Sequence, residues 1–346
     1  MLSPRTETIL KSIVTHYINR ATPVPSQLVA EDPALGGISS ATIRNEMAQL
    51  EQLGYIIRPH TSAGSVPSDK GYRYYVESLR DVRLSEAEQR LISHLFHQVE
   101  KETEQWLSLT ATLLARLVKN VAVVTMPKPA DCKFKHLELV SLQDTLALIV
   151  LVLHGAKIKQ RLITFNEAVH QPSLTAISNK LNDAYSGLNR HQIRAKEIEL
   201  TPLEQQIVDY LTEMMQAEDE QEYDEPYLDG LHFMLNQPEF AHTERMQPLM
   251  ELVEQRSLLK AIIPAQMKRH TVQVIIGKEN KAKAIQNYSV VISQYGLPEE
   301  AEGTIGVVGP TRMPYSHTIP TVGYLSSVLT ELMTGLYGKV TSPRTA

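Results

Sequence analysis

The chain has 346 residues, of which 42% are hydrophobic and 21% charged, and its formal net charge at pH 7 is −5. This length accommodates two or three domains with buried cores, and the mild negative charge excludes a uniformly basic nucleic-acid-binding surface. A single cysteine, Cys132, excludes an internal disulfide and a cysteine-based metal cluster, and it favours a reducing compartment.

The sequence contains neither a signal-peptide core at its start nor a membrane-spanning run. Its longest apolar stretch, residues 145–153, is far too short to cross a bilayer. We therefore expect a soluble, cytoplasmic protein that has no membrane partner.

The first part of the chain begins with two predicted helices. Residues 6–18 repeat apolar side chains at helical spacing, which predicts an amphipathic helix. Pro23 and Pro25 end this helix. Residues 26–35 predict a short second helix, after which two glycines supply a turn.

A third helix and a hairpin follow. Ser39 and Ser40 can cap this helix, and Gly54 ends it. Its apolar face carries Ile43, Met47 and Leu50. Residues 55–58 and 65–67 predict two short strands. Ser68 and Asp69 can then cap a further helix.

The order helix, glycine stop and hairpin is typical of the end of a winged helix-turn-helix, whose third helix enters a major groove while the hairpin grips the backbone. A three-helix packing unit without nucleic acid is the alternative. The candidate DNA contacts are Ser39, Ser40, Thr42, Arg44, Asn45, Arg58, His60, Thr61, Ser62 and Gly64.

The charge of this first part limits how it can bind DNA. Residues 1–80 hold 8 Lys/Arg and 7 Asp/Glu, which gives a net charge of +1. Phosphate neutralisation therefore depends on a few placed cations, for which Arg44, Arg58, Lys70 and Arg73 are the candidates.

Residues 85–118 contain neither Gly nor Pro and predict two helices or one long bent helix. His94 and His97 are three residues apart, a spacing that would place two metal ligands on one helix face. No Cys, Asp or third His stands nearby, so we expect no metal site.

Two strand-rich stretches follow, separated by about eighty residues of other sequence. The first comprises 121–125, 133–140, 145–153 and 157–165 with a helix at 172–186, and the second comprises 271–276, 288–293 and 303–308 with a closing helix at 321–336. This order predicts one α/β domain interrupted by an insertion at about 188–266.

The predicted insertion begins with a helix at 202–215 and continues into an acidic run, which has seven Asp/Glu among residues 217–229. We expect a solvated loop rather than a cation site, because the acids lack a ligand spacing. Residues 227–235 predict a strand and 243–263 a helix. The insertion's own core, or a surface that pairs two copies, would be formed by Leu231, Phe233, Leu249, Leu252 and Val253.

No pattern in the chain predicts catalysis or a bound cofactor. Gly303, Gly306 and Gly309 are spaced as in a nucleotide-binding loop, but they stand among strand residues and open no helix. We interpret them as turn and close-packing glycines. No nucleophile elbow, HExxH motif or Ser-x-x-Lys set occurs in a supporting context, so we expect no enzyme.

Several of these segments resemble the HrcA family of heat-inducible transcription repressors. In the first part they are Ser39 to Met47, Leu50 to Tyr55, Pro59 to Gly64 and Gly71 to Tyr75. Later ones are Asn236 to Phe240 and Gly306 to Tyr315, so the resemblance covers essentially the whole chain. Two positions depart from the family pattern. Ser65 stands where Arg is usual, which leaves the hairpin tip with one cation fewer, and Pro25 stands where Gly is common.

The resemblance implies an α+β multidomain fold. Its parts would be an N-terminal winged helix-turn-helix domain at 1–82, a helical connector at 83–119, and a GAF-like α/β domain at 120–187 and 267–346, interrupted by an inserted dimerisation domain at 188–266.

The resemblance also implies a transcriptional repressor of chaperone operons that binds an inverted-repeat operator, the CIRCE element, in double-stranded DNA. Such an operator requires a homodimer, because its two half-sites are related by a two-fold axis. The family further implies that GroE chaperonin maintains the active form and that heat titrates it away. Two other functions stay open: a small-molecule-sensing regulator that uses the GAF-like domain, and an RNA-binding module.

Overall fold

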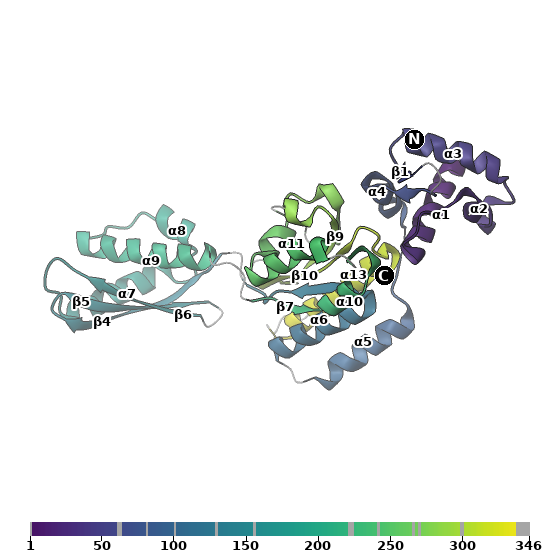
Figure 1. The fold of residues 1–346 in the computed structure, drawn as a ribbon. Coiled ribbons are helices and arrows are strands. Elements are labelled where there is room, and N and C mark those ends of the chain that lie inside the picture. Colours follow the sequence, from purple (N-terminus) through teal and green to yellow (C-terminus); the bar gives the residue numbers. More distant parts are fainter. Residues whose placement is uncertain are drawn as a thin grey trace. The chain divides into compact units, whose positions relative to one another are not determined.

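The computed structural model describes residues 2–60, 64–80, 82–99, 102–128, 131–154, 157–220, 225–240, 243–264, 267–268, 271–297 and 301–336. The chain forms two compact units. The first comprises residues 1–127, 223–297 and 302–346, and the second, which we call the inserted unit, comprises 128–222 and 298–301. Within the first unit we call residues 2–80 the head and the described residues from 82 onward the body (Figure 1).

The head contains the helices and the hairpin that the sequence predicts. Its elements are α1 (Pro4–Arg20), α2 (Ser26–Ala30), the 3₁₀ turn η1 (Pro33–Leu35), α3 (Ser40–Gln52), β1 (Ile56–Ile57), β2 (Val66–Pro67) and α4 (Asp69–Ser78). The second helix is shorter than expected, since the Asp32 side chain caps a separate turn by accepting from Ala34 N–H. Gly54 ends α3 with a φ of 77°, a conformation that favours glycine.

Periodic apolar side chains join these elements into one core. Ile9 and Ile13 of α1 and Ile43 and Leu50 of α3 are fully buried. β1 and β2 pair antiparallel with Ile56 opposite Pro67. The spacing of apolar residues in the sequence therefore predicts the packing of the head.

The body is built on a five-stranded sheet in the order β7-β3-β10-β9-β8. Its strands are β3 (Val121–Val124), β7 (Tyr227–Asp229), β8 (Gln273–Ile276), β9 (Tyr288–Leu297) and β10 (Ala301–Pro310). Alternate residues of β3 enter different cores. Ala122 and Val124 pack with helical residues of 103–118 and 315–336, whereas Val121 and Val123 pack with helical residues between 231 and 262.

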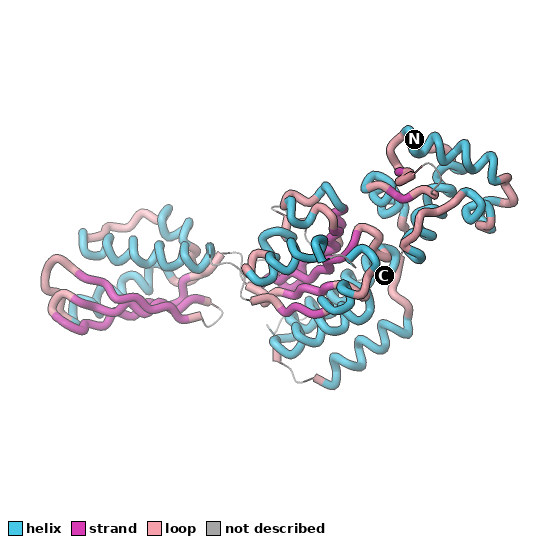
Figure 2. Tube along the Cα trace, in the orientation of Figure 1, coloured by secondary structure: helices cyan, strands magenta, loops and turns pink. Residues whose placement is uncertain are grey.

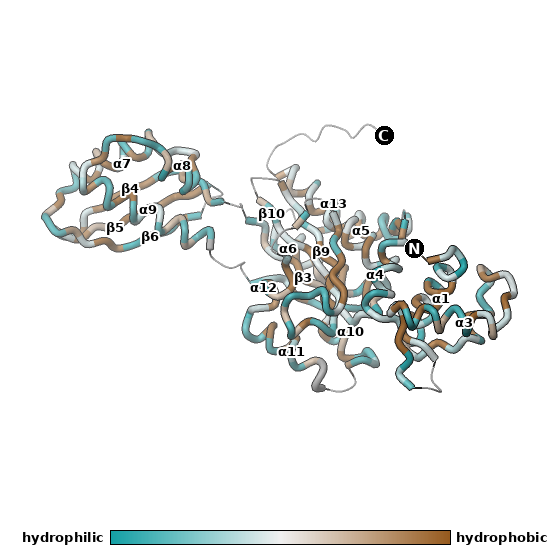
Figure 3. The backbone as a smooth tube through the Cα atoms, turned by 90° about the horizontal axis from the view of Figure 1, so that it is seen from above, coloured by the Kyte–Doolittle hydropathy of each residue, from teal (hydrophilic) through white to brown (hydrophobic). Residues whose placement is uncertain are grey.

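Helices thus cover both faces of the body sheet, which lies between them as a hydrophobic layer (Figure 3). On one face lie α5 (Glu86–Gln98), α6 (Thr103–Val118) and α13 (Tyr315–Leu336), and on the other lie α10 (Leu231–Leu235), η2 (Pro238–Phe240), α11 (Thr243–Glu254), α12 (Leu258–Ile262) and η4 (Lys283–Ile285). The 3₁₀ turn η3 (Gly277–Glu279) follows β8 directly.

The inserted unit has its own sheet, in the order β4-β5-β6, with antiparallel neighbours (Figure 2). Its elements are β4 (Phe134–Gln143), β5 (Leu146–Leu153), β6 (Ile158–Thr164), α7 (Gln171–Tyr185), α8 (Arg190–Ala195) and α9 (Pro202–Glu220). Apolar residues of one sheet face, such as Leu137, Ile149 and Ile163, share a core with the helices.

The boundaries of the insertion differ from the expected 188–266, because β4, β5 and β6 pair with one another and none of them joins the sheet of β3. The segment that separates from the rest of the chain is therefore 128–222. The predicted strand at 227–235 is wrong beyond residue 229, since Gly230, with a φ of 92°, caps the start of α10. The predicted helix at 243–263 is two helices, α11 and α12.

The acidic run also differs from the expected solvated loop. Its first acids lie at the end of α9, where Glu218 pairs with Lys157 and Lys159 at 2.7 and 2.6 Å. Asp219 pairs with Arg190 at 3.0 Å. Glu222 and Asp224 lie outside the described residues.

The glycine-rich segment forms strand β10, as the packing interpretation predicts. A Cβ on Gly303 would lie 2.5 Å from Tyr295 Oη, and one on Gly309 would lie 2.7 Å from Asn120 Cγ. These glycines allow neighbouring side chains to approach the backbone.

Among the described residues, no helix has both the length and the apolar character that a membrane span requires.

Candidate nucleic-acid interface

Helix α3 presents the candidate recognition surface. Ser39 caps the helix, because its Oγ accepts from Thr42 N–H at 3.2 Å. Ser40 and Thr42 are half-buried, whereas Arg44 and Asn45 are exposed on the outer face. Within the described part of the chain, neither Arg44 nor Asn45 has a side-chain hydrogen bond or ion pair. Their donors are therefore available to a ligand.

The inner face of α3 is fixed to α1 by a buried carboxylate. Glu46 accepts from Thr6 Oγ1 at 2.7 Å and from Arg5 Nε at 3.0 Å. The hydrogen bond from Thr6 holds the pKa of Glu46 below its ordinary value, and Arg5 adds to this effect, although burial opposes it. The contact fixes how α3 is rotated, so that Arg44 and Asn45 face outward.

The hairpin contributes fewer free groups than the sequence predicts. Arg58 is 3.4 Å from Glu51 of α3 in an ion pair, and His60 is exposed. Gly64 serves the fold, since a Cβ there would lie 2.6 Å from Val24 O. The predicted contacts Thr61 and Ser62 lie outside the described residues.

Ser65 is not an exposed tip residue as the sequence predicts. It is 1% exposed, and its backbone exchanges two hydrogen bonds of 2.9 Å with Val24. The Ser65 Oγ is buried, and it has no hydrogen-bond partner among the described residues. An arginine at this position would therefore have to extend out of the core before it could meet a phosphate.

Three of the four candidate cations make contacts inside the protein, and the first of these is Arg58 in its ion pair with Glu51. Lys70 Nζ donates to Leu53 O at 2.8 Å and lies 4.4 Å from the Tyr55 ring centroid. Arg73 donates to Glu279 of the body. Arg44 is left as the cation best placed for DNA. Nothing in the sequence near Arg73 pointed to its partner, which lies 206 residues away along the chain.

The predicted dimerisation residues belong to the core of the body. Leu249 is fully buried, and Leu231, Leu252 and Val253 pack against the same core. Phe233 lies under Lys119, whose Nζ is 4.6 Å from its ring centroid. Leu249 is therefore a core residue, whereas the other four side chains pack against the core and are half-buried.

The inserted unit carries an apolar surface that the sequence analysis missed. On the sheet face opposite the helices, Leu142, Ile158 and Leu162 are 50%, 65% and 59% exposed. Val140 pairs with Leu148, and Leu148 in turn pairs with Leu162, so the apolar side chains cross all three strands. The unbroken apolar run of β5 was the available signal, because it predicts a strand covered on both faces. We call this surface the open sheet face.

The described residues hold no group of three or more His, Cys, Asp or Glu side chains that could bind a metal. His97 Nδ1 lies 2.7 Å from Ser93 O one turn earlier in the same helix, and His94 Nε2 lies 3.0 Å from Gln98 Nε2. These histidines make local helix contacts.

A family model and several known proteins match this chain, and the proteins match it over almost its whole length. A family model described as the HrcA protein C-terminal domain matches residues 104–319. A heat-inducible transcription repressor HrcA of Dehalococcoides mccartyi is 56% identical over 339 residues, which cover 98% of each chain. The protein of the same name from Herpetosiphon aurantiacus is 38% identical over 351 residues, covering 98% of this chain and 97% of that one.

A solved structure supports the overall fold. It is described as the crystal structure of a hypothetical protein at 2.2 Å resolution, and it aligns with a TM-score of 0.58 and 24% identity over 96% of this chain and 98% of that one. The resemblance seen in the sequence motifs is confirmed by the sequence relatives. The chain belongs to the HrcA family of heat-inducible transcription repressors.

Proposed function

We propose that this protein represses heat-shock genes by binding an inverted-repeat operator upstream of chaperone genes as a homodimer. The head would act as a winged helix-turn-helix, with α3 in the major groove and the β1–β2 hairpin on the adjacent backbone. The observation that carries this proposal is the outer face of α3, where Arg44 and Asn45 are exposed and unpaired within the described part of the chain.

The chemistry of these two side chains suits base recognition. A guanidinium can donate two parallel hydrogen bonds to guanine, and an Asn amide can pair with adenine through one donor and one acceptor. The hydroxyls of Ser39 and Thr42 at the start of α3 would contact phosphates in this arrangement.

A single head would bind weakly at physiological salt, because few of its cations are free for phosphate. Dimerisation supplies the second set of contacts, and we assign it to the open sheet face of the inserted unit. Three antiparallel strands present Val140, Leu142, Ile158 and Leu162 on this face. Exposed apolar surface of this kind marks an interaction site, and a second copy of the same face would be self-complementary.

The proposal is tested by titrating the full-length protein into a labelled duplex that carries the inverted repeat, followed by fluorescence anisotropy. We expect saturation at two chains per duplex and much weaker binding to a duplex in which one half-site is scrambled. Equal affinity for scrambled DNA would contradict sequence-specific repression. We further propose that GroE chaperonin raises the fraction of protein able to bind the operator and that heating lowers it. Adding GroE before the DNA, at two temperatures, tests this.

A cavity in the body supports a second candidate function, small-molecule sensing. It has a volume of about 560 Å³ and is lined by aromatic and apolar side chains that include Phe96, Trp106, Tyr324 and Leu332. Pockets of this size and character bind small apolar ligands. Native mass spectrometry of the purified protein distinguishes the candidates, because a sensor would carry, or shift on adding, a bound mass that changes operator affinity.

A further inference from the structure

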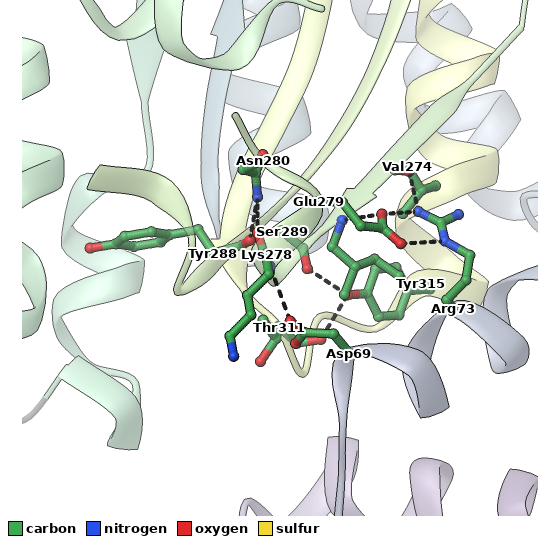
Figure 4. A network of polar contacts seen from close by, with 12 residues as sticks. Asp69, Arg73, Val274, Lys278, Glu279, Asn280, Tyr288, Ser289, Thr311 and Tyr315 are labelled. Carbon is green, nitrogen blue, oxygen red and sulfur yellow. Dashed lines mark hydrogen bonds and ion pairs between the residues drawn. The ribbon is translucent and has the colours of Figure 1, made fainter. Parts of the chain in front are cut away.

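The head and the body are joined by a set of polar contacts between α4 and the turn after β8 (Figure 4). Arg73 donates through Nε to Glu279 Oε1 at 2.8 Å, through Nη2 to Glu279 Oε2, and also through Nη2 to Val274 O at 2.6 Å. Bidentate pairs of this kind fix orientation as well as distance. The hydrogen bond to Glu279 raises the pKa of Arg73.

The second contact is shaped by a glycine. Asp69, at the start of α4, accepts from Lys278 N–H at 3.0 Å. Gly277 has a φ of 52°, and a Cβ there would lie 2.5 Å from Asp69 Cγ. The turn can therefore hold the carboxylate only while position 277 has no side chain.

Two further contacts join the head and the body, one at the end of α1 and one beside the turn. Arg312 donates to Ile18 O at 2.9 Å, at the end of α1, while it also pairs with Glu239. Tyr72 of α4 packs against Tyr315, with ring centroids 6.0 Å apart. The Tyr315 hydroxyl is itself held, since it donates to Thr311 O at 2.7 Å.

These contacts hold the head both beside the turn after β8 and at the end of α1, and two separate places of contact restrict its orientation on the body. They leave α3 untouched, because Arg44 and Asn45 remain exposed. The contacts therefore orient the head without blocking its DNA-binding face.

We propose that Asp69, Arg73, Gly277 and Glu279 are positioning residues that set which spacing between two half-sites the repressor accepts. We call them the head latch. The inference rests on the proposed function, since spacing matters only to a dimer that binds two half-sites. Two half-sites face the same side of DNA only when they are separated by whole helical turns. A dimer can distinguish such separations from others only if both heads are held in a fixed orientation.

The test uses Gly277→Ala in the full-length protein, with Gly187→Ala as the matched control. Gly187 also has a positive φ, 80°, but a Cβ there would meet nothing within 4 Å. Alanine at position 187 therefore adopts a similarly unfavourable backbone conformation, but its Cβ meets no neighbouring atom. Arg73→Ala and Glu279→Ala break the ion pair from opposite sides. The second of these leaves every side chain of the head unchanged, so a lost phosphate contact cannot explain its effect.

Each variant is titrated into duplexes whose half-site separation varies, and into a single half-site. We expect wild type and Gly187→Ala to discriminate by at least about tenfold against separations wrong by half a turn, about 5 base pairs. Gly277→Ala, Arg73→Ala and Glu279→Ala should reduce this discrimination to about threefold or less, while single half-site affinity stays within about twofold of wild type. Full discrimination in the folded latch variants would overturn the proposal.

A measurement without DNA separates this inference from the proposed function. Spin labels on Gln52→Cys and Lys281→Cys, both exposed positions, report the distance from head to body in chains diluted with unlabelled protein. The native Cys132 is buried, and burial raises the pKa of its thiol, so it resists labelling. We expect one narrow distance distribution in wild type and a broad one in Gly277→Ala. Equal distributions would overturn the latch, whereas a narrow wild-type distribution in a protein that ignores inverted repeats would overturn only the proposed function.

Discussion

Arg44 and Asn45 are one position apart on α3, and both are exposed. If α3 enters the major groove, Arg44→Ala should weaken operator binding by about 1–3 kcal/mol, the range for a positioned base contact. Asn45→Ala should instead relax the preference for adenine at one position, because the amide reads that base. Anisotropy titrations against the operator and single-base variants measure both effects.

The control for this prediction is Arg90→Ala, which removes a cation from α5 of the body, where the side chain is 77% exposed. It should leave operator affinity unchanged. Wild-type binding by folded Arg44→Ala and Asn45→Ala proteins would show that this face of α3 does not meet DNA.

A second residue-scale prediction concerns Glu46, whose folded-state pKa is lowered from 4.5 by Thr6 and Arg5. A lowered pKa means that the carboxylate stabilises the fold above about pH 4.5 and that this stabilisation is lost as the pH falls through the folded-state value. Glu46→Gln should cost about 1 kcal/mol at pH 7 and nothing in strong acid, measured by urea unfolding at several pH values. Glu86→Gln is the control, because the Glu86 side chain is 88% exposed. It should leave the free energy of unfolding unchanged both at pH 7 and in strong acid. A cost independent of pH would contradict the role of the charge.

At the scale of elements, the open sheet face yields a direct prediction. Leu162→Glu places a charge among the exposed apolar side chains of the proposed dimer contact and should raise the dimer Kd at least about thirtyfold, or about 2 kcal/mol, as for an interface residue that contributes strongly to binding. Sedimentation velocity measures the change. Leu91→Glu is the matched control, since Leu91 is also 50% exposed but lies on α5. A Leu162→Glu protein that remains dimeric would place the contact elsewhere.

The helices of the head follow directly from the sequence. The head was predictable because its information is local: Ser39 and Ser68 cap α3 and α4, and apolar residues at helical spacing mark the buried faces. The outer face of α3 follows from the same periodicity.

Strand partners were not predictable in this way. The strands expected at 133–140, 145–153 and 157–165 are β4, β5 and β6, but local patterning does not tell which sheet a strand joins. The boundary of the insertion was therefore misplaced. The contacts of Arg73 and the burial of Ser65 were likewise missed, because both depend on residues distant in sequence.

At the scale of the whole molecule, the inserted unit takes the place of a hairpin turn. The chain leaves the body sheet after Val124 and returns at Tyr227, and these two residues are paired directly across β3 and β7. A short linker can therefore replace residues 128–222 without moving either strand. Removal of the insertion as the sequence bounded it, 188–266, would instead take β7, α10, η2, α11 and α12 from the body and α8 and α9 from the inserted unit.

We propose that two heads, paired through the inserted unit, bind the two halves of one operator. A protein in which a short Gly/Ser linker replaces residues 128–222 can be compared with the full chain. Sedimentation and anisotropy are measured on the same inverted-repeat duplex. We expect the linker protein to be a folded monomer whose affinity for the whole operator falls to that for a single half-site. A linker protein that stays dimeric and binds the operator as tightly as the full chain would contradict it.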